Sequence, residues 1–172
     1  MPATRAQLFA RLDDLGIAHK TVEHPPLFTV EESKRLRGDI PGAHTKNLFL
    51  KCKKGTLWLI VALESTQIEL KRLHARLGSG RLSFGKPELL REVLGVEPGS
   101  VTPFALINDT QQQVSVVLDE AMLACEPLNF HPLENTATTA ISKEGLLAFI
   151  KSCGHEPRVM SFAQEPGADA VA

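Results

Sequence analysis

Two apolar runs, NLFLKC at 47–52 and TLWLIVAL at 56–63, stand on either side of the short segment 53–55, which has the sequence KKG. Runs of this length that are rich in leucine, valine and isoleucine, and that are separated by a glycine-containing turn, are typical of a β-hairpin. A strand buries its apolar side chains only by joining a sheet that packs against another layer. The sequence therefore predicts a sheet to which the rest of the chain must be fitted.

The remaining pattern predicts helices interspersed with strands. A capping box of Thr4 and Gln7 begins a first helix, which places Leu8, Leu12 and Leu15 on one face. Further helices are expected at 29–38, 68–78, 86–95 and 142–154. Further strands are expected at 18–24, 101–108, 113–119, 128–133, 136–141 and 157–162. Strands in runs with helices between them indicate an α+β fold, a compact single domain whose mixed, largely antiparallel β-sheet is flanked by helices.

The length of 172 residues fits one domain, and 43% hydrophobic with 23% charged residues is typical of a globular protein. No apolar run approaches the roughly 20 residues that span a bilayer, and the first residues lack the apolar region of a signal peptide. We therefore expect a cytoplasmic monomer without membrane contact. Residues 1–162 are expected to form the domain, and 163–172 a flexible C-terminal tail that is rich in small residues.

Charge and cysteine content exclude several kinds of site. A formal net charge of −1 argues against tight, sequence-blind binding of nucleic acid, and the absence of tyrosine argues against a platform that stacks several bases. Cys52, Cys125 and Cys153 lie far apart and are odd in number, so they fit neither a disulfide framework nor paired zinc ligands. We expect no metal and no cofactor.

Four lysines lie in the stretch GAHTKNLFLKCKKG at 42–55. Seven strand residues at about 3.3 Å each put roughly 23 Å between Lys46 and Lys53, so these two residues cannot serve one small site. Lys51, Lys53 and Lys54 are interpreted as an exposed hairpin that discourages pairing at a sheet edge. For Lys46, spacing alone leaves two interpretations open, an ordinary lysine at the entrance of a strand or a functional group.

Two further features are ambiguous on physical grounds alone. In GSVTP at 99–103, Gly99 permits unusual dihedral angles and Pro103 stiffens the exit, so the loop could direct free amides at a ligand oxygen. The alternative, a plain connection between a helix and a strand, is the interpretation that physical grounds alone favour. His131, in NFHPL, lies in an apolar strand, where a single histidine is more often a hydrogen-bonded structural group than a base.

Together these features resemble the YbaK and prolyl-tRNA-synthetase-associated editing-domain family over nearly the whole chain. The resemblance is carried by PLFTVEES (26–33), HTKNLFL (44–50), LSFGKPELL (82–90), GSVTPFALIND (99–109) and FHPLENTATTAIS (130–142). The asparagine after the lysine, Asn47, is most similar to the free-standing, alanine-specific branch. The branch that removes cysteine from the same tRNA usually has another residue there.

The resemblance implies a compact α+β fold and hydrolysis of the ester that joins a wrong amino acid to proline tRNA, without a metal. It implies that Lys46 is the central site residue, that Asn47 and His131 hold the aminoacyl end, and that a ribose hydroxyl of the substrate assists the water. The backbone loop beside the scissile carbonyl would comprise Gly99, Ser100, Val101, Thr102 and Pro103. We further hypothesise that Leu27 and Phe28 build the wall that excludes proline.

The expected substrate is the acceptor end of mischarged alanyl-tRNA(Pro), with prolyl-tRNA synthetase or an elongation factor as a further partner. Two alternatives stay open: a deacylase for cysteinyl-tRNA(Pro) or another aminoacyl-tRNA on the same fold, and a non-catalytic module that binds RNA or nucleotides. Lys20, Lys34, Arg35 and Arg81 could contact phosphates but are equally readable as surface charge.

Overall fold

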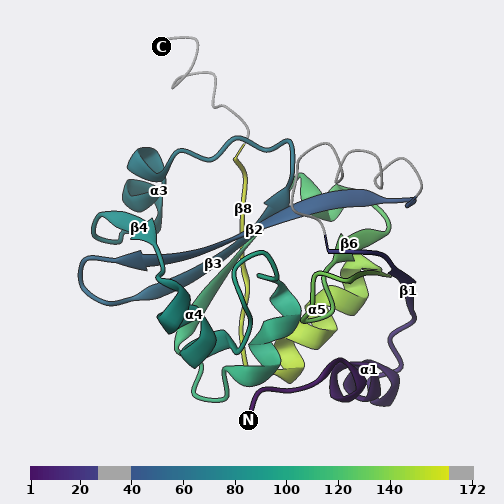
Figure 1. Cartoon of the computed structure of the whole chain (residues 1–172). Helices are drawn as coiled ribbons and strands as arrows, with labels where there is room; N and C mark the ends of the chain where they lie inside the picture. Colours follow the sequence, from purple (N-terminus) through teal and green to yellow (C-terminus); the bar gives the residue numbers. More distant parts are fainter. Residues whose placement is uncertain (27–39, 163–172) are drawn as a thin grey trace.

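The computed structural model describes residues 1–26 and 40–162 (Figure 1). The helix expected at 29–38, the proposed wall residues Leu27 and Phe28, and the tail at 163–172 lie outside the described residues. Within them, no helix has both the length and the apolar character needed to cross a membrane.

Helices and strands alternate along the chain. The helices are α1 (Arg5–Asp14), α3 (Leu70–Leu77), α4 (Pro87–Leu94) and α5 (Lys143–Ser152), with two 3-10 helices, η1 (Pro103–Asn108) and η2 (Met122–Ala124). The strands are β1 (His19–Glu23), β2 (Ala43–Cys52), β3 (Leu57–Leu63), β4 (Leu82–Phe84), β5 (Val114–Asp119), β6 (Leu128–Phe130), β7 (Ala137–Ile141) and β8 (Arg158–Met160).

The sheet is mixed, as expected. Its strands follow the order β1-β7-β6-β2-β3-β5-β8, and β4 pairs with β2 outside this path. Of the seven pairings among the described strands, β1–β7, β2–β3, β2–β4 and β6–β7 are antiparallel, whereas β2–β6, β3–β5 and β5–β8 are parallel. β2 pairs with three strands, β3, β4 and β6, and therefore joins the β1-β7-β6 part of the sheet to the β3-β5-β8 part.

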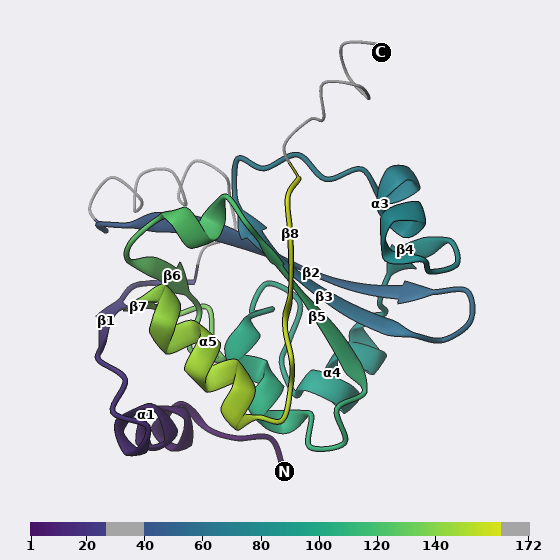
Figure 2. The same ribbon diagram turned by 180° about the vertical axis from the view of Figure 1, so that it is seen from behind.

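Helices cover the sheet unequally. In Figures 1 and 2, α1, α4 and α5 lie on one side of the sheet, and α3 lies on the other side near the β2–β3 hairpin. The main core forms where α1, α4, α5 and η1 meet the sheet, and Phe49, Phe104 and Phe149 belong to it. A smaller core forms under α3, where Leu50 and Ile60 of the sheet pack with Leu73.

Local signals explain several helix ends. Thr4 and Gln7 form the expected capping box at α1, and α4 starts at Pro87 and ends at Gly95, which has left-handed dihedral angles. Leu8 and Leu12 are fully buried, but Leu15 is 40% exposed. The expectation that Leu15 continues the helical face of Leu8 and Leu12 is therefore wrong, because the helix ends at Asp14, one residue before it.

Three strand predictions need correction. Residues 103–108 form η1 and not a strand, because the Thr102 hydroxyl accepts a hydrogen bond from the Phe104 amide and Pro103 occupies the first helical position. The short strand β4 was not expected. Strand β2 begins at Ala43 and not at residue 47, so Lys46 lies inside the strand and not at its entrance.

The interpretation of the hairpin lysines as protection for a sheet edge is also wrong. β3 pairs with one side of β2, and β4 pairs with the other side at Leu50–Cys52, so β2 has a partner on both sides at Lys51. Lys51, Lys53 and Lys54 are nevertheless exposed, as expected.

Candidate active site

Lys46 is half-buried in β2, opposite Ala62 of β3. Its ammonium group donates a hydrogen bond to the backbone carbonyl of Thr66, in the segment that follows β3. An ammonium group has three N–H donors and no acceptor. After this bond, two donors remain with which Lys46 can contact an anionic or carbonyl oxygen of a ligand.

Lys46 and Asn47 face opposite sides of the sheet, because successive strand side chains alternate. Leu48 and Leu50, on the side of Lys46, pack in the smaller core, whereas Phe49, on the side of Asn47, is buried in the main core. The side-chain oxygen of Asn47 is buried and has no hydrogen-bond partner among the described residues. The two neighbours therefore do not form one cluster through their side chains.

The parallel pairing of β2 with β6 brings the distant histidine motif toward Lys46. His44 is paired with Asn129, and the Thr45 hydroxyl donates to the carbonyl of Asn129 at 2.7 Å. The ladder ends there, so Lys46 and His131 each lie two residues beyond the last paired residues of β2 and β6. Because side chains alternate along a strand, Lys46 is on the same face of β2 as His44.

His131 is held as a neutral imidazole. Its Nδ1 lies 2.9 Å from the carbonyl of Ala137, and because a carbonyl can only accept, Nδ1 carries the proton and Nε2 keeps a free lone pair. Burial lowers the pKa of His131, and the nearby His24 ring acts in the same direction, whereas the bond to Ala137 opposes them. The group can therefore accept a hydrogen bond at Nε2.

His24, which sequence reasoning did not assign to the site, lies beside His131. The two rings meet edge to face with centroids 6.2 Å apart. Nδ1 of His24 donates to the carbonyl of Pro25, so its Nε2 accepts from the hydroxyl of Thr138, each at 2.9 Å. His24 is thus fixed beside His131 by hydrogen bonds at both of its ring nitrogens.

The loop 99–103 lies next to the β6–β7 connection. Gly99 has φ +91°, and a Cβ placed there would meet Asn135 of that connection at 3.9 Å. The amide of Ser100 donates to the carbonyl of Glu97, whereas no hydrogen bond from the amides of Gly99 or Val101 is found within the described part of the chain. Those two amides are the donors with which the loop could bind a ligand oxygen.

The rest of the loop serves to anchor it. Ser100, Thr102 and Pro103 are buried, and Val101 packs against the main core. Thr102 caps η1 with its side chain, so its hydroxyl is engaged within the fold. Of the residues expected in this loop, Gly99 is the exposed one.

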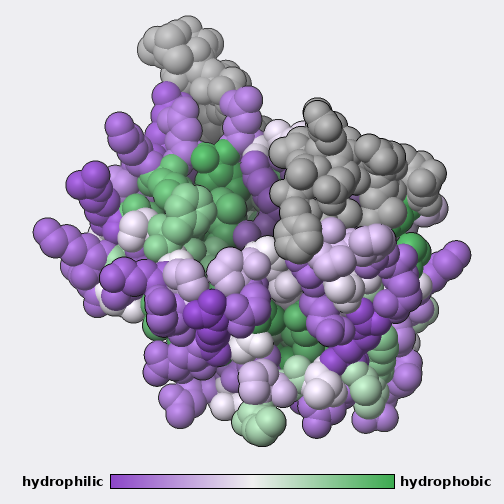
Figure 3. Space-filling model, in the orientation of Figure 1, coloured by the Kyte–Doolittle hydropathy of each residue, from purple (hydrophilic) through white to green (hydrophobic). Residues whose placement is uncertain are grey.

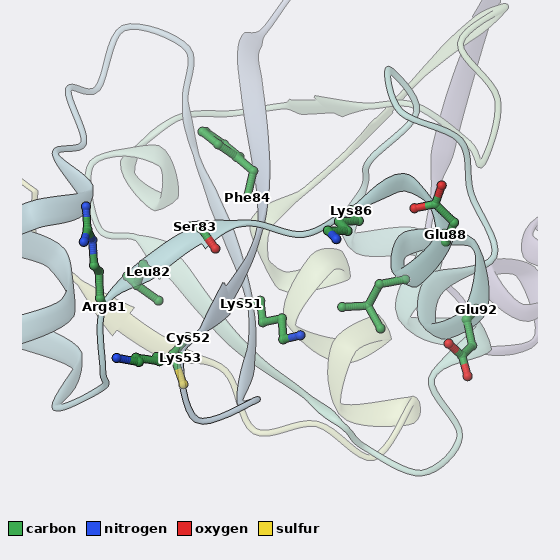
Figure 4. A pocket seen from close by; sticks show the side chains of 11 residues that line it. Lys51, Cys52, Lys53, Arg81, Leu82, Ser83, Phe84, Lys86, Glu88 and Glu92 are labelled. Carbon is green, nitrogen blue, oxygen red and sulfur yellow. The ribbon is translucent and has the colours of Figure 1, made fainter.

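A basic pocket lies at the hairpin end of β2 (Figure 4). Its open volume is about 590 Å³, and exposed Lys51, Lys53, Arg81 and Lys86 lie along it. In Figure 4, Arg81 and Lys53 lie at one end, whereas Glu88 and Glu92 of α4 lie at the other. Lys51 and Lys53 lie at the end of β2 and just after it, whereas Arg81 and Lys86 immediately precede β4 and α4. Sequence spacing could not group these two pairs.

An apolar surface adjoins this pocket. Figure 3 shows a hydrophobic area beside α3 and β4 with hydrophilic side chains around it. Phe84, at the end of β4, is 62% exposed and also lines the basic pocket. A flat aromatic side chain beside several cations is a combination that suits single-stranded nucleic acid.

Within residues 1–26 and 40–162, no three side chains of histidine, cysteine, aspartate or glutamate lie close enough together to hold a metal ion. The polar groups that the candidate residues offer are the ammonium group of Lys46, the imidazole of His131 and the backbone amides of Gly99 and Val101. This set can bind and polarise an oxygen-containing ligand by hydrogen bonding.

Comparison of the sequence with known proteins identifies the family of the chain and several relatives. Residues 24–149 match the model of the aminoacyl-tRNA editing domain. The chain is 42% identical to the mouse (Mus musculus) prolyl-tRNA synthetase associated domain-containing protein 1, over 92% of this chain and 96% of that protein. It is 35% identical to the prolyl-tRNA editing protein ProX of Acetoanaerobium sticklandii, over 86% of this chain and 91% of the relative.

Structural comparison supports the fold. A crystal structure described as a candidate trans-editing enzyme for prolyl tRNA synthetase superposes with a TM-score of 0.69 and 22% identity. The match covers 94% of this chain and 98% of the other. At this identity the likeness extends to the fold, a single compact domain with a mixed sheet and helices.

Proposed function

Because the chain belongs to the aminoacyl-tRNA editing domain family, a family of deacylases, we propose that it hydrolyses the ester of mischarged alanyl-tRNA(Pro) in trans. The observation that carries this proposal is the pairing of β2 with β6, after which the tethered ammonium of Lys46 and the imidazole of His131 each follow two residues beyond the last paired residues. The proposed reaction uses water as the nucleophile, because an activated aminoacyl ester does not require a covalent intermediate with the protein.

In the proposed reaction, water attacks the ester carbonyl, and a tetrahedral intermediate forms. Its carbon–oxygen bond to the ribose then breaks, the ribose oxygen takes a proton, and alanine and free tRNA are released. The amides of Gly99 and Val101 would bind the developing oxyanion, a contribution typically worth about 10²–10³ in rate for one donor. A ribose hydroxyl of the terminal adenosine would help to orient the water, as the family resemblance implies.

Lys46 and His131 would hold the substrate. The two remaining donors of Lys46 suit the terminal phosphate or the ester oxygen, since a charge-assisted hydrogen bond is stronger than a neutral one. The free Nε2 of His131 can accept from the α-ammonium group or a ribose hydroxyl. The buried side-chain oxygen of Asn47 lies on the opposite face of the same strand, so Asn47 would not share a binding site with the side chain of Lys46.

Selectivity against proline requires exclusion and not attraction. One extra methylene group changes affinity by only about 1–3 kcal/mol, which is too little to protect the abundant correct product. A rigid wall that rejects the proline ring can do more. Leu27 and Phe28 remain our proposal for this wall.

The basic pocket would receive the acceptor stem. Lys51 lies five strand residues from Lys46, roughly 17 Å along β2. Lys51 faces the opposite side of β2 from Lys46, so a tRNA with its terminal adenosine at Lys46 would have to cross the hairpin end of the sheet to bring phosphates of its acceptor end over Lys51, Lys53 and Arg81. Exposed cations of this kind position a nucleic acid without reading its sequence.

The direct test is deacylation of a panel of tRNA(Pro) charged with alanine, cysteine, serine or proline. We expect rapid loss of alanine and retention of proline. Loss of cysteine without loss of alanine would overturn the alanine assignment in favour of the cysteine-specific alternative. Binding of every charged tRNA without hydrolysis would favour the non-catalytic RNA-binding module.

A further inference from the structure

Asp119 is a fully buried carboxylate at the end of β5, outside the set of groups discussed so far. A buried carboxylate is costly unless hydrogen bonds replace its water. Its Oδ1 accepts from the amide of Ala121 at 3.1 Å. Its Oδ2 accepts from the amide of Leu63 at 3.1 Å and from the hydroxyl of Thr66 at 2.6 Å.

These bonds fix the turn that follows β3. The amide of Thr66 donates to the carbonyl of Leu63 at 3.0 Å, and the amide of Glu64 donates to the carbonyl of His44 in β2 at 3.0 Å. Asp119 thus ties the end of β5 to the end of β3 and to Thr66 beyond it. The backbone carbonyl of Thr66 is the acceptor for the ammonium of Lys46.

We propose that Asp119 and the hydroxyl of Thr66 are positioning residues that fix the carbonyl to which Lys46 is tethered, and so hold its ammonium ready for the substrate. A lysine side chain has four rotatable bonds and loses much conformational freedom when it is fixed. If the carbonyl that binds the lysine is itself held in place by a buried carboxylate, the lysine side chain is already ordered. Less conformational entropy is then lost when the substrate binds. This inference rests on the proposed function for the role of Lys46.

The chain offers a matched control at the other end of β5. Asp109 is also buried, at 1% exposure, and accepts from the amides of Gln113 and Val114 at 3.0 and 2.9 Å. It faces His155 at 3.3 Å, and no hydrogen bond connects it to Thr66 or Lys46. Asp109→Asn and Asp119→Asn therefore remove similar structural carboxylates, of which the second is connected to Lys46.

The first experiment measures single-turnover deacylation of alanyl-tRNA(Pro) at a temperature where all variants are folded. Thr66→Val removes the hydroxyl with little change of shape, and we expect the rate to fall about tenfold. Thr66→Ser keeps the hydroxyl and should stay within about twofold of the natural protein. Asp119→Asn should resemble Thr66→Val, whereas Asp109→Asn should lower the melting temperature without changing the rate.

A double-mutant cycle separates positioning from general loosening. If Thr66 acts through Lys46, then Thr66→Val should change the residual rate of a Lys46→Ala protein by less than about twofold. The inference is overturned if Thr66→Val still slows the Lys46→Ala protein tenfold. It is also overturned if Asp119→Asn and Asp109→Asn slow the natural protein equally.

A second readout needs no substrate. In a ¹H–¹⁵N spectrum of lysine ammonium groups, the tethered Lys46 should give a signal that Lys46→Ala removes. We expect this signal to broaden in Thr66→Val and Asp119→Asn but not in Asp109→Asn. If the signals follow this pattern but the protein hydrolyses no aminoacyl-tRNA, the proposed function is refuted, whereas the inference that Thr66 and Asp119 position Lys46 stands. An unchanged signal in both variants would refute the tether itself.

Discussion

At the scale of single residues, Lys46 is defined by where its neighbours point. Leu48 and Leu50 anchor its face of β2 in the smaller core, and Thr66 holds its ammonium group. Its sequence neighbour Asn47 is committed to the opposite face. The two adjacent residues of this sequence motif therefore lie on opposite faces of β2.

Lys46→Ala should lower kcat/KM for alanyl-tRNA(Pro) by about a hundredfold, a loss typical of removing one charge-stabilising donor. Lys54→Ala is the matched control, because Lys54 is exposed on the same hairpin and does not line the basic pocket. Single-turnover rates of both variants give the comparison. Equal activity of Lys46→Ala and the natural protein would remove Lys46 from the reaction.

The burial of His131 predicts a pH dependence of stability. Because the pKa of His131 is lowered in the folded state, the unfolded chain takes up a proton first as the pH falls below the pKa of a free imidazole, about 6.5. Folding free energy should therefore be lost as the pH falls from about 6.5 to the lowered pKa of the folded state. His131→Asn should lose less over this interval, as measured by urea unfolding at several pH values. Equal losses in the two proteins would contradict this sign.

At the scale of elements, apolar periodicity predicted the hairpin and most helices but not η1 or β4. Residues 103–108 are apolar enough for a strand, and their conformation is set by Thr102 and Pro103 at the start of the segment. β4 has three residues, too few for a pattern, and forms because β2 offers it hydrogen bonds. Local propensity yields to tertiary pairing in such short segments.

Two glycines at the ends of β2 provide a matched test of close backbone approach. Gly42 and Gly55 have φ +102° and +94°, so alanine is strained at both, by about 1–2 kcal/mol. A Cβ at Gly42 would also lie 2.6 Å from the carbonyl oxygen of Pro127, whereas Gly55 has open space. We expect Gly42→Ala to destabilise the protein by about 2 kcal/mol more than Gly55→Ala in urea unfolding. Equal losses of unfolding free energy in the two variants would show that the backbone at Pro127 can move to accommodate a Cβ at residue 42.

At the scale of the whole molecule, sequence reasoning predicted the class of fold but not its connections. The parallel pairs β2–β6, β3–β5 and β5–β8 join segments far apart in the chain, and no periodicity encodes such pairing. The same limit applies to the candidate site. Lys46, His131 and Gly99 were singled out by resemblance, whereas Thr66, Asp119 and the grouping of the basic pocket depend on contacts that appear only in the folded chain.

The basic pocket leads to a prediction for the complete complex of protein and tRNA. If Lys51 and Arg81 each contact a phosphate, then Lys51→Ala and Arg81→Ala should each reduce the slope of log K against log salt concentration by about 0.7–0.9. Affinity should fall at low salt, and the hydrolysis rate of bound substrate should stay nearly constant. Lys151 is an exposed lysine of α5, and the control variant Lys151→Ala should leave the slope unchanged. Equal slopes in all three variants would move the acceptor stem to another face of the molecule, because charges that contact no phosphate release no counterions.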